Sequence, residues 1–363
     1  MFTYEISESI TGKPVQNVTR LATRESSWER LVGQVTSGST TFSLAASPFS
    51  RAQHRTLFMP WTHQLNICWN RWPIYSGLIT QAGWTQRTKR LTVKSSSLRI
   101  LLSRRLMFPV GGWGTGTVDA YSLDIRRAMA LFVRKALLDG NPRWKVPLTI
   151  IGHVGGSRRD TVHNDSFQTA EDIISALEAE ANAPDIDFRP RRVPLSDYFE
   201  HEVRIGDPAN GGLLDGPSLE WARGAQDVKT VTEGIDMVTG AFTPGEGSEQ
   251  IRPFGQSALD TGLEPYQGPY LDKVQTFSRA ASLDQLDAFA RAIRIANSEP
   301  RELMSFTVRS DGRNKLDQFM PGMRARALVR GDEWLPPGWS PWQYVLGYSG
   351  GSNRSVTLKV KGG

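Results

Sequence analysis

The chain of 363 residues is longer than one hydrophobic core usually supports, so we expect two or three domains. Its hydrophobic content of 39%, with 11 Trp and 15 Phe, excludes a disordered protein, while 34 Gly and 21 Pro indicate many turns and short strands. The net charge of +6 is spread along the chain, and without a run of like charges a nucleic-acid-binding tail is not indicated.

Further classes of protein are excluded by what the sequence lacks. The single cysteine, Cys68, excludes an internal disulfide and a zinc site built from several cysteines. No stretch approaches about eighteen uninterrupted apolar residues, so we expect no membrane-spanning segment. The N-terminus has no basic region followed by an apolar run, so we expect no secretory signal and synthesis in the cytoplasm.

Residues 40–93 show apolar side chains at every second position, which is typical of strands with one buried face. A turn is predicted at Asn70-Arg71-Trp72-Pro73, between two of these strands. We therefore predict an N-terminal β-barrel domain at residues 1–105. The alternating apolar positions are Phe42, Leu44, Leu65, Ile67, Trp69, Leu91 and Val93.

Residues 106–185 are predicted to form a helical insertion domain. A first helix starts near Ser122 and ends before Gly140, because its apolar residues fall on one helical face. A second helix is indicated by Thr169-Ala-Glu-Asp172, the pattern of a capping box.

Residues 186–275 are predicted to form a mixed β and loop domain. Short extended pieces are expected at residues 186–188 and 202–205. The Gly- and Pro-rich stretch at residues 239–270 is predicted to be a long loop, and a loop of this length usually has a functional or interface role.

Residues 276–363 are predicted to contain a helix followed by a C-terminal β-barrel domain. Ser282 caps the helix, which ends before Pro300. Strands are expected at residues 304–308, 325–329 and 356–360. The predicted fold class is α+β, mostly β, with β-barrel domains near both termini and a helical or mixed middle region. The helix is predicted to bury Leu283, Leu286, Phe289, Ala290 and Ile293.

Two pairs of carboxylates could act as acid and base. Asp185 with Asp187, and Glu200 with Glu202, would each lie on one face of a strand, roughly 6 to 7 Å apart, as in some glycosidases. The simpler interpretation is that these carboxylates face solvent or form salt bridges with another subunit. We expect no catalytic residue and no cofactor.

Histidines offer a second possible chemistry, because His153 and His163 flank Asp160 and Asp165 in a Gly-rich stretch. None of these spacings is diagnostic of a metal, and polar loops of this composition are common. We expect no metal site.

Three tryptophans in a Pro-rich segment, Trp334, Trp339 and Trp342, are candidate contacts for a glycan or a protein partner. Tryptophans more often bury in cores and subunit interfaces. A loop restrained by prolines, however, cannot easily turn all three inward.

The order of several motifs resembles that of the tail hub, or minor tail, proteins of siphophages, which are related to the baseplate hub of contractile phage tails. Each motif alone is weak, and their order along most of the chain makes the resemblance. The motifs are Trp28-Glu-Arg-Leu, Pro73-Ile-Tyr-Ser-Gly-Leu-Ile, Leu98-Arg-Ile-Leu-Leu-Ser-Arg-Arg105, Ala183-Pro-Asp-Ile-Asp-Phe-Arg-Pro190, Val203-Arg-Ile-Gly-Asp-Pro208, Met320-Pro-Gly-Met-Arg-Ala-Arg-Ala-Leu-Val and Tyr344-Val-Leu-Gly-Tyr-Ser.

This resemblance implies tail-tube-like barrels and a non-enzymatic structural protein at the tail tip of a virion. It implies a homo-oligomer, expected to be a trimer, whose ring continues the tail tube and serves host attachment and genome ejection. The implied partners are the distal tail protein, the tail tube, the tape measure and other tail-tip proteins, with genomic DNA only in transit through the lumen. The alternatives are a cell-wall glycan hydrolase and a carbohydrate-binding tail module.

Overall fold

The computed structural model divides into two compact units, Met1–Val228 with Ser305–Gly363, and Lys229–Met304. The structure describes residues 1–108, 116–139, 145–150, 156, 158–163, 167–180, 183–206, 212–213, 215–222, 225–245, 252–257, 269–276, 282–310 and 313–362.

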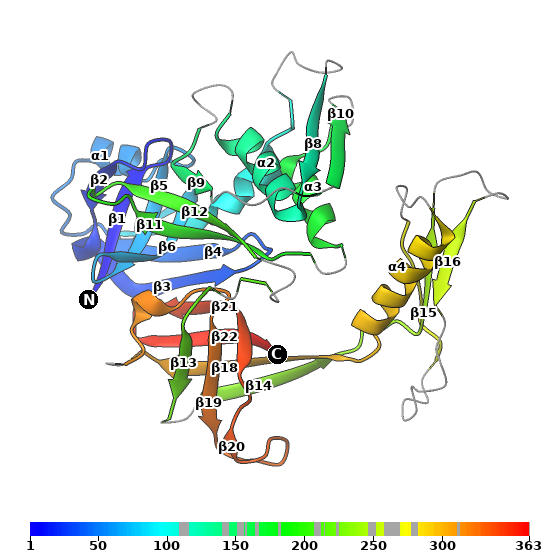
Figure 1. The fold of residues 1–363 in the computed structure, drawn as a ribbon. Coiled ribbons are helices and arrows are strands. Elements are labelled where there is room, and N and C mark those ends of the chain that lie inside the picture. The colour runs from blue at the N-terminus through cyan, green and yellow to red at the C-terminus, as the bar shows by residue number, and fades with distance from the viewer. Residues whose placement is uncertain are drawn as a thin grey trace. The chain divides into compact units, whose positions relative to one another are not determined.

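One antiparallel sheet runs through most of the first unit in the order β18-β22-β21-β3-β4-β7-β6-β5-β1-β2 (Figure 1). The strand β14 (Gln226–Glu233) pairs with β18. Each of these two strands has some of its residues in the first unit and the others in the second. The strands of the sheet are β1 (Phe2–Glu8), β2 (Pro14–Asn17), β3 (Ala22–Leu31), β4 (Ser37–Ser43), β5 (His63–Trp69), β6 (Trp72–Thr85), β7 (Arg90–Ser96), β18 (Arg301–Arg309), β21 (Gln343–Gly351) and β22 (Ser355–Gly362).

The N-terminal part of this sheet is rolled up. Tyr4 on β1 and Phe42 on β4 are four strands apart along the sheet, yet their ring centroids are 6.3 Å apart in an edge-to-face contact. Leu65, Ile67 and Val93 are completely buried in the same part, as the alternation predicts. At the predicted turn, Asn70 and Arg71 adopt positive φ angles between β5 and β6.

The C-terminal strands continue the same sheet because β21 pairs with β3. Figure 1 shows the red strands of the chain's C-terminal end beside the blue strands of its N-terminal end. Edge-to-face contacts link Trp28 to Tyr348, Tyr348 to Phe319, and Phe319 to Trp221. Also in this part are β13 (Ser218–Trp221), β19 (Arg324–Val329), β20 (Gly338–Trp339) and the short helix η5 (Leu316–Gln318).

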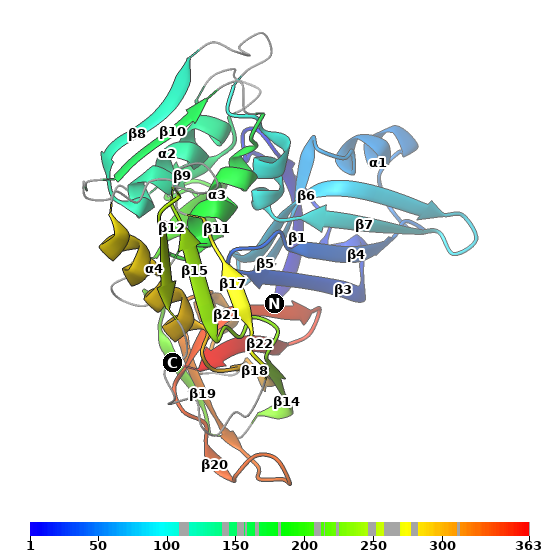
Figure 2. The ribbon, with the colours of Figure 1, turned by 90° about the vertical axis from the view of Figure 1, so that its right-hand side faces the viewer.

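The middle of the chain adds a smaller sheet in the order β11-β12-β9, with α2 and α3 close by (Figure 2). A separate hairpin pairs β8 with β10. The predicted helices are confirmed, but Asp124 rather than Ser122 caps α2, since its carboxylate accepts the backbone N–H of Arg127 and Ser122 lies in β8. These elements are β8 (Thr117–Leu123), α2 (Ile125–Leu137), β9 (Leu148–Ile150), β10 (Arg158–His163), α3 (Ala170–Glu178), β11 (Ile186–Arg192) and β12 (Phe199–Ile205).

The first unit also contains three short helices that the sequence pattern does not predict. They are η1 (Thr19–Leu21), α1 (Arg51–Leu57) and η2 (Leu98–Arg104).

The second unit packs the helix α4 (Leu283–Ala296) on a small sheet of β15 (Gly240–Pro244), β16 (Phe254–Ser257) and β17 (Asp272–Val274). The prediction of one long loop at residues 239–270 is therefore wrong for β15 and β16. Gly255 allows β16 to pack closely against α4, because a Cβ at this position would lie 2.2 Å from the backbone of Leu286.

The predicted cap and buried face of α4 are confirmed in part. The Ser282 side chain accepts the N–H of Gln285, and Leu286, Ala290 and Ile293 are buried. Leu283 and Phe289, in contrast, are exposed, because the small sheet covers only a narrow stripe of the helix.

The predicted fold class, α+β and mostly β, is confirmed. None of the helices in the described part of the chain has the length and apolar character that a bilayer-spanning helix needs.

Candidate functional site

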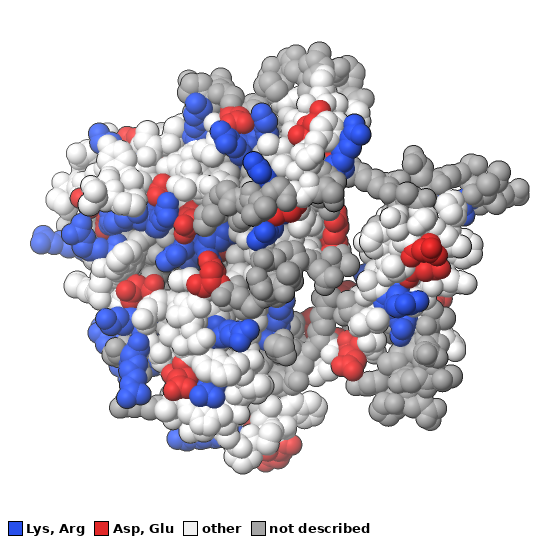
Figure 3. Space-filling model, in the orientation of Figure 1, with Lys and Arg blue, Asp and Glu red and all other residues white. Residues whose placement is uncertain are grey.

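One face of the hairpin β11–β12 carries a ladder of opposite charges. The strands are antiparallel, and their register places Asp187 opposite Arg204, Arg189 opposite Glu202, and Arg191 opposite Glu200. Opposite charges facing each other across strands stabilise such a pair. Figure 3 shows basic and acidic side chains intermixed where β11 and β12 lie in Figure 1.

The outer rungs of the ladder are ion pairs in partial contact with solvent. Arg191 contacts Glu200 at 2.8 Å and Glu202 at 3.0 Å, and Arg189 lies 3.6 Å from Glu202. The hydroxyl of Thr149 on β9 also donates to Glu200. Each acidic side chain of these rungs therefore already has a cation.

The inner rung is buried and reaches three parts of the chain. Asp187 accepts two hydrogen bonds from Arg30 of β3, at 2.8 and 3.0 Å, and one from Arg204 at 2.9 Å. Arg204 also pairs with Asp215 and donates to the carbonyl of Pro321, while Arg30 donates to the Tyr348 hydroxyl at 2.8 Å. This buried junction, formed by Arg30, Asp187 and Arg204, links β3, the β11–β12 hairpin and the segment before β19.

The charges of the buried junction depend on each other. Burial alone would raise the pKa of Asp187, but the two guanidinium groups outweigh it and hold that pKa below its usual value. Burial would lower the pKa of Arg30, and Asp187 more than offsets this. Asp187 is therefore fixed as a carboxylate and is unsuited to act as a general acid.

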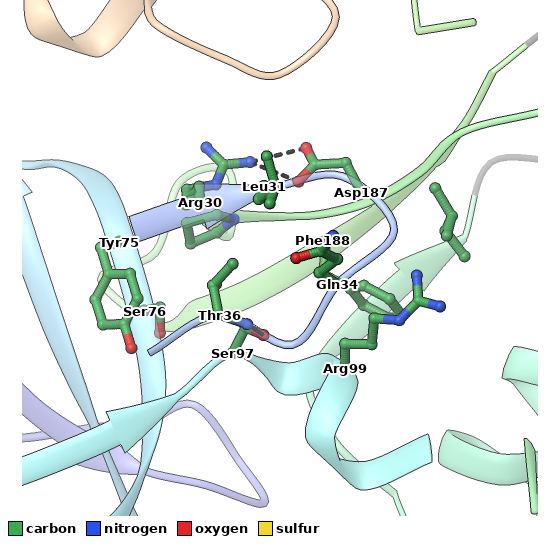
Figure 4. A pocket seen from close by; sticks show the side chains of 12 residues that line it. Arg30, Leu31, Gln34, Thr36, Tyr75, Ser76, Ser97, Arg99, Asp187 and Phe188 are labelled. Carbon is green, nitrogen blue, oxygen red and sulfur yellow. Dashed lines mark hydrogen bonds and ion pairs between the residues drawn. The ribbon is translucent and has the colours of Figure 1, made fainter. Parts of the chain in front are cut away.

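A small cavity of about 20 Å³ lies beside the junction, which is room for one water molecule. Figure 4 shows Arg30 and Asp187 pointing toward each other on one side of it and Arg99 on the other. Arg99 is buried and binds both Glu171 and Glu178 of α3, so it ties η2 to that helix. The cavity is too small for an organic ligand.

The carboxylates that the sequence offered as acid and base are all engaged. Asp187, Glu200 and Glu202 are held by arginines in the ladder, and the remaining one, Asp185, accepts a hydrogen bond from the Tyr344 hydroxyl at 2.6 Å. The geometry gives Asp187, Glu200 and Glu202 the role of structural ion pairs within the chain, and Asp185 that of a hydrogen-bond acceptor.

A buried polar chain between β5 and β12 was not predicted. The alternating sequence predicts that one face of β5 is polar and exposed. In the structure both faces of β5 are buried, and Gln64 and Asn66 lie on the face that was expected to be exposed. The Ser76 hydroxyl donates to Asn66 at 2.5 Å, and His201 of β12 lies 3.5 Å from Gln64. Burial, and next to it the charge of Arg30, lowers the pKa of His201 to about 4.

The histidines considered for a metal site lie partly outside the described residues, which exclude His153 and Asp165. Within the part of the chain that the structure describes, no group of three or more His, Cys, Asp or Glu side chains could hold a metal ion.

The three predicted tryptophans lie near the hairpin of β19 and β20. The guanidinium of Arg326 lies between two of them, 4.9 Å from the Trp339 ring centre and 4.5 Å from that of Trp342, which is cation–π geometry. Arg326 also pairs with Glu220 at 2.7 Å. Trp334 is 74% exposed and is the most accessible of the three.

Comparison with protein-family models finds no match. A search of curated proteins finds none either.

Solved structures, in contrast, match nearly the whole chain. The 43 kDa tail protein of prophage MuSo2 from Shewanella oneidensis aligns with a TM-score of 0.60 and 10% identity, covering 99% of this chain and 98% of that one. A tail protein from Neisseria meningitidis aligns with a TM-score of 0.58 and 10% identity, over 99% and 96% of the chains. The prophage tail protein gp18 from Listeria monocytogenes gives 0.55 and 7%, over 99% and 94%.

These similarities establish the fold, and the resemblance inferred from the order of the sequence motifs is confirmed at that level. The chain has the fold of phage tail proteins.

Proposed function

We propose that the chain is a structural protein of a phage tail, and more specifically the hub at the tail tip. The observation that carries the proposal is the match to the Shewanella tail protein along 99% of this chain and 98% of that one. A match over both full lengths concerns the arrangement of all the elements and is not limited to one common β-motif.

In this proposal the protein is a homotrimer whose ring continues the tail tube and joins the distal tail protein to the tip or fibres. The large sheet of the first unit supports this proposal. It contains strands from both ends of the chain, and β2 is the edge strand at one end of the strand order. An open sheet edge is a template for pairing with another chain, and ring closure would cover it. The division into domains at residues 1–105, 106–185, 186–275 and 276–363 is part of the proposal.

The oligomeric state tests the proposal. Native mass spectrometry over a series of concentrations should show a species of three chains of 40.4 kDa. The contact between copies should exceed the roughly 1,000 Å² that separates specific from incidental interfaces. Binding to the purified distal tail protein is the second readout. A protein that stays monomeric at high concentration and binds no tail protein would contradict the proposal.

For the tryptophans we propose a partner contact centred on Trp334. Trp339 and Trp342 each have a ring face against Arg326, so they support the hairpin, whereas Trp334 is largely exposed. The partner would be a tail-tip or fibre protein, with a surface glycan as the alternative.

A further inference from the structure

Two turns of the first unit carry exposed apolar side chains. Trp72, which follows the turn between β5 and β6, is 58% exposed. In the turn between β11 and β12, Leu195 is completely exposed and Tyr198 is partly exposed. We call the surface formed by Trp72, Leu195 and Tyr198 the turn surface.

Charged contacts hold the two turns together. Arg71 in the first turn pairs with Asp197 in the second at 2.8 Å. Arg192 at the end of β11 donates to the carbonyl of Arg71 at 3.0 Å and to that of Asp197 at 2.7 Å. The same guanidinium pairs with Glu5 of β1 at 2.8 Å and lies 4.2 Å from the ring centre of Phe199. The turn surface is therefore preorganised, which reduces the entropy lost when a partner binds.

The backbone of Leu195 is strained. Its φ angle is 61°, in the left-handed region that residues with a Cβ rarely adopt and that Asn tolerates better than Leu. Within the isolated chain, a leucine at this position has an unfavourable backbone and leaves its side chain in water. Strain of this kind is common at functional sites, and the exposed leucine gives it a purpose only when a partner covers the side chain.

The residue types and charges of the turn surface favour a protein as the partner. Trp, Tyr and Arg are enriched at the centres of protein interfaces. The central pair of Arg71 and Asp197 has no net charge. A nucleic acid or an anionic membrane, in contrast, binds through several unpaired cations.

One cation borders the turn surface. Arg354 lies 5.2 Å from the ring centre of Trp69, and Trp69 is opposite Trp72 across the turn. Arg354 forms no ion pair among the residues that the structure describes. A single carboxylate of a partner would complement this charge.

We infer that the turn surface docks into an apolar pocket of a different tail protein, with a carboxylate of that protein next to Arg354. This inference rests on the proposed function. Leu195 at the tip of its turn requires a pocket of apolar character. The cavity beside the buried junction is too small to receive it, and the groove along β3 and β21 is lined mainly by polar side chains and glycines. These two pockets do not fit Leu195, so a different protein is favoured over a second copy of this chain.

Crosslinking in assembled tails tests the occupant. A photo-crosslinking phenylalanine derivative replaces Leu195, and in the control it replaces Ile235, which is similarly exposed in the turn after β14. We expect position 195 to capture a peptide of a different tail protein that contains apolar residues and at least one Asp or Glu. Position 235 should not capture the same peptide.

Every other outcome at position 195 contradicts the inference. A captured peptide of this chain would identify a second copy as the occupant, captured lipid would identify a membrane, and no crosslink would mean that the turn surface stays in solvent. A chain that never enters tails would overturn the proposed function as well. A chain that enters them without the expected crosslink would contradict only this inference.

The variant L195N separates docking from a role in folding. The captured protein is purified and titrated against the isolated variants, and its Kd for L195N should rise about tenfold or more, as for the central residues of an interface. The unfolding midpoint of L195N should stay unchanged or increase, because Asn tolerates the left-handed backbone. I235N is the control and should bind like the wild type. Unchanged binding by L195N, or a lower unfolding midpoint, would overturn the docking role of Leu195.

Discussion

The buried carboxylate of Asp187 connects β3 to the β11–β12 hairpin. It is a carboxylate shared by two buried arginines, Arg30 and Arg204, that come from different parts of the sequence. Two buried cations with one buried anion are stable only while the anion is present, because each unpaired charge in the interior is costly.

Replacing Asp187 with Asn tests this dependence. D187N should lower the free energy of unfolding by about 3 to 5 kcal/mol, because it leaves Arg30 buried without a counter-charge and leaves Arg204 paired only with the more exposed Asp215. The control is E25Q in the exposed pair of Glu25 and Arg90, which should cost less than about 1 kcal/mol. Denaturant unfolding measures both, and equal effects would contradict the role of the buried junction.

His201 predicts a dependence of stability on pH. Its pKa is about 4 in the folded protein, and about 6.5 is expected when unfolded. Between these values only the unfolded state takes up a proton, so stability should fall as pH drops from about 6.5 to about 4, by about 3 kcal/mol in total.

The variant H201Q should flatten this pH profile, since it removes the titrating group and keeps a side chain that can contact Gln64. Urea unfolding at several pH values in this range is the measurement. H54Q is a suitable comparison, because His54 is only half-buried and burial lowers its pKa less. An unchanged slope in H201Q would show that other groups set the profile.

Trp334 is the residue on which the proposed partner contact depends. W334A should weaken binding to tail-tip partners and leave the stability of the chain nearly unchanged, because the side chain is 74% exposed. W84A is the control, as Trp84 is also exposed but lies on β6. Pull-down from disassembled tails measures binding, and equal binding by both variants would remove Trp334 from the contact.

At the scale of elements, the sequence predicts what depends on local pattern. Alternation identified β5 and its buried Leu65 and Ile67, and capping residues identified α3 and α4. The charged ladder could not be predicted, because its rungs depend on the register between β11 and β12. The burial of Gln64 depends likewise on a second layer, which alternation within β5 does not reveal.

The wrong prediction at residues 239–270 has a physical reason. Glycine is frequent both in loops and where two backbones pack closely, and Gly255 belongs to the second class. G255A should destabilise the packing of α4 on β16 by about 1 to 3 kcal/mol, as overpacking does.

Hydrogen exchange of the α4 amides measures that effect, and faster exchange in G255A is the expected result. G83A is the control, because a Cβ there would meet its nearest atom at an ordinary 3.8 Å. Unchanged exchange in α4 would mean that the helix shifts away from β16 at little cost.

The pairing of β3 with β21 joins strands from both ends of the chain in one sheet. The sequence predicts β-rich ends, but pairing between residues more than 300 positions apart depends on the complete fold. The similarity to tail proteins concerns this whole arrangement, and the proposed ring extends it to several copies.

A reconstruction of the assembled tail by electron microscopy would show whether this chain forms the proposed ring. We predict three copies of this chain in a closed ring at the tail tip, in line with the tail tube. Density at the tip that this chain does not fit, or tails from which the protein is absent, would rule out the proposed tail hub.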